Sequence, residues 1–128
     1  MAPRCPLVHI DEVEPEKTGP GGGPAVVDLR FPISRRQGVP NSAFLARFHP
    51  GATALKHRHD GCDELVYILS GRGRFGPDGV EVRPGHVRFI PRGGEHWLRN
   101  MRAAEPLDVL ALFPGGGSRV ETRVAGVG

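Results

Sequence analysis

The centre of the chain contains residues whose side chains commonly bind metal ions. His57 and His59 are two positions apart, and Glu64 follows shortly after them. Alternate side chains of a β-strand project to the same face, so both imidazoles are expected to point the same way. If the chain turns back as a hairpin after His59, Glu64 lies beside them. Two imidazoles and a carboxylate on one face would leave coordination positions of a bound ion open.

A fourth candidate ligand, His96, lies further along the chain. It follows Gly93 and Gly94, which suit a sharp turn with positive φ. Such a turn would aim His96 back at the sheet, and pairing of its strand with that of His57 would complete a site of three histidines and one carboxylate. The alternative is that the first two histidines are a solvated pair and that Glu64 is a surface acid.

The elements that must position these residues are predicted to be short strands. The chain has 19 glycines and 13 prolines, which favour many turns over long helices. Apolar runs at 43–48, 64–69, 86–90 and 107–113 are separated by such turn residues. No window combines a helical period with capping signals. We therefore predict an all-β fold, a small antiparallel sandwich or barrel.

The length of 128 residues predicts a single domain with one core. Residues 1–24 include an acidic stretch that becomes rich in glycine and proline, and they are expected to form a flexible N-terminal arm. The barrel is expected at 25–114. Residues 115–128 are expected to be a tail that could add an edge strand.

Composition and charge argue against several classes of partner. The net charge is only +3, and the arginines are spread along the chain, so the clustering of a nucleic-acid interface is missing. No apolar segment reaches the length of a membrane span. The N-terminus lacks the apolar region of a signal peptide, and we expect a cytoplasmic protein. Cys5 and Cys62 have no ligand spacing and suggest a disulfide only weakly.

The spacing in both histidine segments resembles that of the cupins. The residues that match the two cupin motifs are Gly51, His57, His59, Glu64 and Gly71 in the first, and Gly85, Pro91, Gly93, His96 and Asn100 in the second. The resemblance covers residues 40–114. One departure is His86, which stands where many relatives carry an acid and is expected to be a turn or surface residue.

This resemblance implies a fold, a cofactor and an oligomeric state. The fold would be a single-domain jelly-roll β-barrel, which is a conical antiparallel β-sandwich. One divalent metal ion (iron, manganese, zinc or nickel) would be held by His57, His59, Glu64 and His96. Since cupins commonly dimerise, a homodimer is expected as well.

Alternation along the strands predicts which side chains line the interior. With Glu64 inward, Val66 and Ile68 also face in, and parity places Leu98 and Phe75 on the inner wall. The opposite face of the 64–69 strand then carries Leu65, Tyr67 and Leu69. That face is too apolar for water, which predicts contact with another sheet or subunit.

Arg88 is predicted to share the inner face with Ile90, whose position lines the barrel in cupins. A buried arginine needs a partner or an anionic ligand. We weigh recognition of a substrate carboxylate, phenolate or enolate against two alternatives: a rim arginine that reaches solvent, or an arginine paired with Asp63 or Asp108.

The predicted function is that of a metal-dependent enzyme acting on a small oxygenated organic molecule. The chain looks similar to cupins that tailor aromatic polyketides as cyclases or oxygenases, and Glu64 is the candidate base. Alternatives are an Fe(II) dioxygenase of a phenolic substrate, a sugar isomerase, or a non-catalytic cupin that binds a ligand or a metal.

Overall fold

The computed structural model describes residues 5–16, 27–34, 40–115 and 122–124 of the chain. These residues form one short 3-10 helix, η1, and ten strands. The bounds are η1 Ile10–Glu12, β1 Val27–Ile33, β2 Ser42–Phe48, β3 Thr53–His59, β4 Glu64–Ser70, β5 Gly73–Gly76, β6 Val80–Val82, β7 Val87–Ile90, β8 His96–Asn100, β9 Leu107–Phe113 and β10 Thr122–Val124. The all-β prediction is confirmed.

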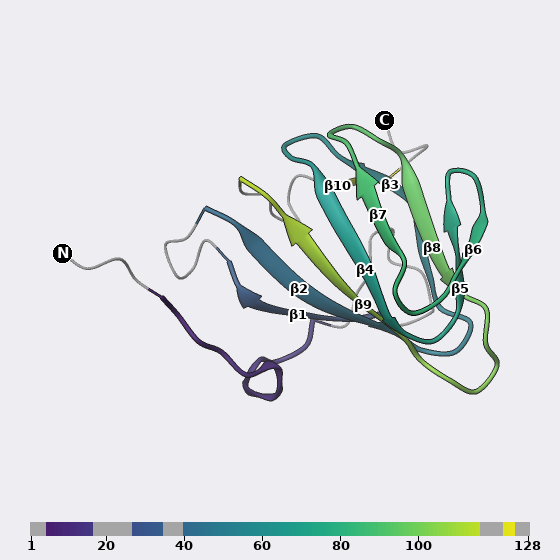
Figure 1. The fold of residues 1–128 in the computed structure, drawn as a ribbon, viewed down its shortest axis with the longest axis horizontal. Coiled ribbons are helices and arrows are strands. Elements are labelled where there is room, and N and C mark those ends of the chain that lie inside the picture. The colour runs from purple at the N-terminus through teal and green to yellow at the C-terminus, as the bar shows by residue number, and fades with distance from the viewer. Residues whose placement is uncertain (1–4, 17–26, 35–39, 116–121, 125–128) are drawn as a thin grey trace.

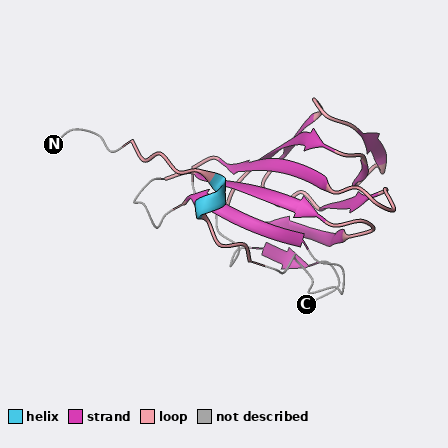
Figure 2. Ribbon diagram, turned by 90° about the horizontal axis from the view of Figure 1, so that it is seen from below, coloured by secondary structure: helices cyan, strands magenta, loops and turns pink. Residues whose placement is uncertain are grey.

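The strands form two five-stranded antiparallel sheets (Figure 1). The first sheet has the order β1-β2-β9-β4-β7, and the second has the order β10-β3-β8-β5-β6. Figure 2 shows the strands layered over one another when the molecule is turned by 90°. Neighbours in each sheet are mostly distant in sequence, as expected of a jelly roll.

The core lies between the sheets and follows the predicted alternation. In β4, Glu64, Val66 and Ile68 are buried, whereas Tyr67 and Leu69 are exposed on the other face. The inward residues of β9 are buried in the same way: Leu107, Val109, Ala111 and Phe113. Each large apolar side chain buried there contributes about 1.5–3 kcal/mol to folding, which favours this register over a slip by one residue.

The hairpin that was expected between the strands of His59 and Glu64 is not formed. β3 belongs to one sheet and β4 to the other, so residues 60–63 cross between the two layers. The prediction was wrong because alternation fixes which face of a strand is buried but does not fix which strand lies beside it. Glu64 therefore faces the histidines from the opposite sheet.

Asn100 holds the end of β8 in place from within the core. Its side chain is 1% exposed, and Nδ2 donates toward the carbonyl oxygens of Phe48, His49 and Glu105 at 3.0, 3.2 and 2.8 Å. Its Oδ1 accepts a hydrogen bond from the backbone N–H of Arg102. One buried amide thus joins β8 to the end of β2 and to the loop before β9.

The two ends of the chain make backbone contacts with edge strands. Glu16 exchanges two backbone hydrogen bonds with Leu29 of β1, each 2.8 Å long. At the other end, β10 pairs with β3, with Thr122 opposite His59 and Val124 opposite His57. Most of the expected N-terminal arm and C-terminal tail lies outside the described residues. No helix in the described parts of the chain is long and apolar enough to cross a membrane.

The outer face of the first sheet carries an apolar patch. Pairing places Leu65 opposite Phe89, Tyr67 opposite Val87, and Leu65 opposite Leu112 on the other side. Phe89 and Val87 are each 59% exposed, and Tyr67, Leu69 and Leu112 are each about 40% exposed. Contiguous apolar patches larger than roughly 300–600 Å² are rare on monomers and mark interaction sites.

We expect this patch to join two copies of the chain. The side chains of the patch carry no charge, and one patch on each of two copies would form an isologous contact. Sedimentation equilibrium should give about twice the chain mass of 13.8 kDa, and Phe89→Glu should give a monomer, because the charge would be buried unpaired. The matched control is Val80→Glu, a change at an exposed apolar side chain of β6 in the other sheet, which should stay dimeric. A monomeric wild type at tens of micromolar would contradict this prediction.

Candidate metal centre

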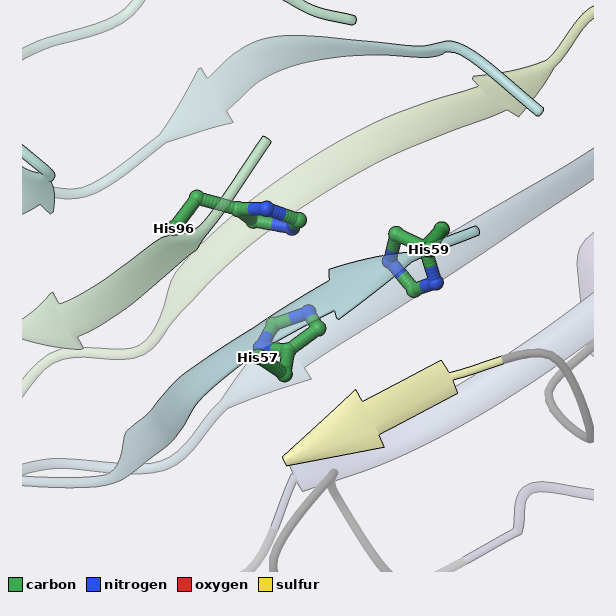
Figure 3. A group of neighbouring side chains, drawn as sticks. All are labelled: His57, His59 and His96. Atoms are coloured by element: carbon green, nitrogen blue, oxygen red, sulfur yellow. The ribbon is translucent and has the colours of Figure 1, made fainter. Parts of the chain in front are cut away.

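Three buried imidazoles converge between the sheets. His57 and His59 come from β3 and His96 from the adjacent β8, and Figure 3 shows their rings turned toward a common space. A ring nitrogen of each lies within 4.8 Å of one from each of the others. All three residues are at most 6% exposed. The three nitrogens converge closely enough to be candidate ligands of a single metal ion, for which imidazole nitrogen is a common ligand.

Strand register and one turn bring the third histidine to the first two. β3 and β8 pair so that His57 is directly opposite His96, as predicted, and their ring centroids are 4.1 Å apart. Gly93 has a φ of 78°, in the left-handed region that favours glycine, and its N–H donates to the carbonyl of His59 at 2.8 Å. Gly94, which was also expected to need positive φ, does not have it.

Two of the imidazoles are already oriented to bind a metal through Nε2. Nδ1 of His57 is 2.6 Å from the carbonyl oxygen of Leu55, and Nδ1 of His96 is 3.0 Å from that of Gly94. A carbonyl can only accept, so each Nδ1 carries the proton and each Nε2 is left with its lone pair. Metal-ligating histidines are typically oriented by such a second hydrogen bond.

Glu64 completes the cluster from the facing sheet. Its Oε1 lies 3.3 Å from Nε2 of His59 and 3.1 Å from Nε2 of His96. Despite these short contacts, this buried oxygen has no hydrogen bond of acceptable geometry among the described residues. A buried carboxylate oxygen without a partner is costly unless a cation neutralises it. The residues therefore fit a divalent metal bound by three imidazoles and one carboxylate.

Burial and mutual contact shift the protonation of the cluster. Desolvation lowers the pKa of His57 from 6.5 to about 4, and the nearby His96 lowers it further, so the ring is neutral near pH 7. Burial by itself would raise the pKa of Glu64, but the adjacent imidazoles of His59 and His96 bring it down from 4.5 to about 2. Neutral imidazole and ionised carboxylate are the forms that ligate metals.

The residues predicted to line the interior are buried on the inner faces of both sheets. Val66 and Ile68 of β4 are buried, as are Phe75 of β5 and Leu98 of β8. Phe75 pairs with Leu98, one inward position along β8 from His96. The inner faces that carry the cluster are therefore largely apolar.

Arg88 lies opposite Val66 on the inward side of β7, but its charge is already neutralised. Its guanidinium donates to both carboxylate oxygens of Asp78, at 3.0 and 3.2 Å, and lies 4.9 Å from the ring centre of Phe75. The alternative of an arginine paired with an acid is the one observed, but the acid is Asp78 and not Asp63 or Asp108, because the turn between β5 and β6 carries Asp78 to the guanidinium. The Arg88 side chain is 23% exposed, so the residue is not fully enclosed.

Two further residues that the sequence drew attention to lie away from the histidine cluster. His86 is an exposed turn residue whose Nδ1 accepts from the N–H of Arg83 at 2.9 Å. Cys62 is buried and forms no disulfide, and it is not part of the group that brings the three histidines together.

Sequence reasoning missed a row of aromatic rings that reaches the cluster. Phe31 stacks on Phe44 at 4.9 Å, Phe44 contacts Phe113 at 5.3 Å, and Phe113 meets the ring of His59 edge-on at 4.9 Å. The alternation in 42–48 places Phe44 on the inward face, and that signal was available. The approach of these rings to a histidine in the other sheet was not.

Comparisons with known proteins agree with this geometry. A family model described as "Cupin domain" matches residues 44–113. The chain is 30% identical over 112 residues to a protein of Thermotoga maritima named oxalate-binding protein, a match that covers 84% of this chain and 92% of that protein. It is also 30% identical over 118 residues to polyketide synthase CurC of Streptomyces cyaneus, which covers 89% and 71% of the two chains.

The fold is shared with a solved structure as well. The polyketide cyclase RemF from Streptomyces resistomycificus superposes with a TM-score of 0.76 at 22% identity, over 98% of this chain and 88% of that one. At this identity the likeness is one of fold.

Metal binding should depend on the buried ligands and not on histidines elsewhere in the chain. His57→Ala removes one ligand, so we expect its affinity for zinc to fall by more than the roughly 10–100-fold that losing an outer hydrogen-bond partner costs. His86→Ala, a change in an exposed turn, should bind as the wild type does. Competition titration against a chromogenic chelator measures both, and equal affinities in the two variants would contradict the assignment.

The neutral His57 should make the metal-free protein sensitive to mild acid. Its folded pKa of about 4 is below the ordinary 6.5, so the unfolded chain binds more protons between these values and stability falls as the pH falls. Between about pH 7 and about pH 5, this ring should lower the free energy of unfolding by about 2 kcal/mol. In urea unfolding, the stability of His57→Gln should decrease by about that much less between the two pH values than the stability of the wild type. The control His9→Gln, which changes an exposed ring, should lose as much stability as the wild type.

Proposed function

Because this chain belongs to the cupin family, we propose that it is a metal-dependent enzyme acting on a small oxygenated organic molecule of aromatic polyketide type. The observation that carries the proposal is the buried cluster of three imidazoles with the carboxylate of Glu64, whose Oε1 lies 3.1–3.3 Å from two of them. Burying such a cluster without a bound ion lowers the stability of the fold. Titratable groups that are kept buried at such a cost are typical of functional sites. Four ligands also leave coordination positions of the ion for a substrate.

The ligand set and the surrounding residues have separate tasks. A divalent ion bound there would supply Lewis-acid chemistry at a substrate oxygen, or oxygen chemistry if it is iron. The apolar wall, which includes Phe75, Ile68 and Leu98, would exclude water and strengthen the charge interactions at the site. Glu64 is ionised at neutral pH, and it would serve as a base if its carboxylate leaves the metal during turnover.

The surroundings of the cluster support an aromatic substrate over a small dianion. No lysine or arginine is buried in the described part of the chain, and Arg88, the arginine on the inward side of β7, is paired with Asp78. The metal would therefore be the main cationic partner for the free carboxylates of a substrate. A flat, weakly polar ring, in contrast, suits the phenylalanines next to the cluster. The 30% identity to a protein named polyketide synthase CurC supports the same class.

A non-catalytic role is the second candidate, because a relative of equal identity is named an oxalate-binding protein. On this alternative the metal would hold oxalate and no product would form. Saturable binding of oxalate to the metal-loaded protein, with no turnover of any aromatic compound, would favour it over the enzyme.

Turnover should require both the metal and Glu64. We expect the iron- or zinc-loaded protein to convert members of a panel of hydroxylated naphthalenes and polyketo esters, detected by liquid chromatography and mass spectrometry, and chelation to abolish the reaction. Oxygen consumption during turnover separates an oxygenase from a cyclase. In Glu64→Gln protein that still carries its metal, the rate should fall by about 10²–10⁴-fold, the usual contribution of a general base.

The matched control is Glu95→Gln, a change at an exposed acid that pairs with Lys56 at 3.2 Å. It should keep the wild-type rate. If Glu64→Gln retains both its metal and full activity, Glu64 is not the base, although the remainder of the proposal stands. If no compound of the panel turns over, the enzyme proposal fails.

A further inference from the structure

We infer that Phe44 and Phe31 are specificity-determining residues that select flat aromatic substrates for the metal centre. This inference rests on the proposed function, because it assigns the part of the site that holds the substrate ring. It concerns rings that touch no metal ligand directly. They reach the cluster only through Phe113.

The geometry of the rings forms a continuous path. Phe31 and Phe44 are nearly parallel, with an angle of 30° between planes, and Phe44 meets Phe113 at 37°. Phe113 then meets His59 at 66°. The row begins at β1, crosses β2 and β9 of the first sheet, and ends at a histidine of the second sheet. Such offset and tilted contacts are those that aromatic rings prefer.

The exposure of the rings changes along the row. Phe113 is 2% exposed, whereas Phe31 and Phe44 are only partly buried, although they pack against the core. Phe44 has the inward parity of its buried neighbours Ser42, Ala46 and Phe48 on β2. An inward ring that keeps accessible surface is available for contact with a ligand, which a fully enclosed core ring is not.

The position of the row relates the accessible surface of Phe31 and Phe44 to the metal centre. Leu112 of β9 is opposite Leu65 of β4. Phe113 follows Leu112 in β9, and Glu64 precedes Leu65 in β4, so Phe113 and Glu64 lie at the same end of this strand pair. The row therefore reaches the end of the first sheet at which Glu64 stands. A fused-ring phenol or enol that directs its oxygen to the metal would direct its ring toward Phe44 and Phe31. The chemical class that fits is a planar, hydroxylated polycycle.

The experiment compares two ligands that differ in flatness. Calorimetric titration of the zinc-loaded protein with 1-naphthol and with its saturated analogue 1-decalol needs no turnover. The wild type should prefer 1-naphthol. Phe44→Leu retains an apolar side chain but removes the ring, so its affinity for 1-naphthol should fall by about three- to tenfold while its affinity for 1-decalol stays within about twofold.

The controls separate ring selection from folding. Phe89→Leu removes a ring from the apolar patch on the outer face of β7 but keeps that patch apolar, so it should keep both the dimer and the preference. Zinc stoichiometry and circular dichroism should be unchanged in all variants. If Phe44→Leu does not bind zinc, Phe31→Leu, at the outer end of the row, takes its place. Loss of zinc by both variants would show that the rings only support the core and would overturn the inference.

Failure of this inference can be told apart from failure of the proposed function. A wild type without preference for 1-naphthol, or a Phe44→Leu variant that keeps the preference, overturns the role of the rings even if the enzyme turns over some substrate. Conversely, a preference that Phe44→Leu abolishes supports the role of the rings even if no product forms.

Discussion

The burial of four titratable side chains against one another is the constraint on which the rest of the structure depends. His57, His59, His96 and Glu64 lose their hydration between two sheets, and the Glu64 Oε1 atom gains no hydrogen bond in return among the described residues. Removing charged or polar groups from water costs several kcal/mol each unless they are paired. The apolar residues on the inner faces of both sheets must offset this cost, and a bound cation would remove much of it.

The surrounding architecture is what makes this convergence possible. Pairing of β3 with β8 brings His57 and His96 together in one sheet, and the crossing at 60–63 carries Glu64 into the other. Asn100 fixes the end of β8 through three carbonyl contacts, and Gly93 turns the chain back just before His96. Ligands from two facing layers enclose a point that ligands from a single hairpin would leave open on one side.

Much of this was predictable from the sequence, and the failures have a common physical origin. Alternation identified Glu64, Val66 and Ile68 as inward, because a strand with one buried face has only one acceptable parity. It did not identify which strand lies beside β4, so a hairpin was expected in place of a crossing. The same limit applies to Arg88, whose partner Asp78 comes from another turn, and to the contact of Phe113 with His59. Parity is a local property, whereas contacts between layers depend on the whole topology.

The ion pair between Arg88 and Asp78 has a consequence for how the specificity of such a barrel can diverge. The arginine lies over Phe75 beside the core, but the acid that neutralises it is in an exposed turn, with a side chain that is 54% accessible. An exposed turn tolerates substitution far better than a packed interior does. Replacing Asp78 by a neutral residue would leave a positive charge uncommitted at the inner wall without altering any ligand or core residue. A change toward anionic ligands can therefore begin with a single substitution on the surface.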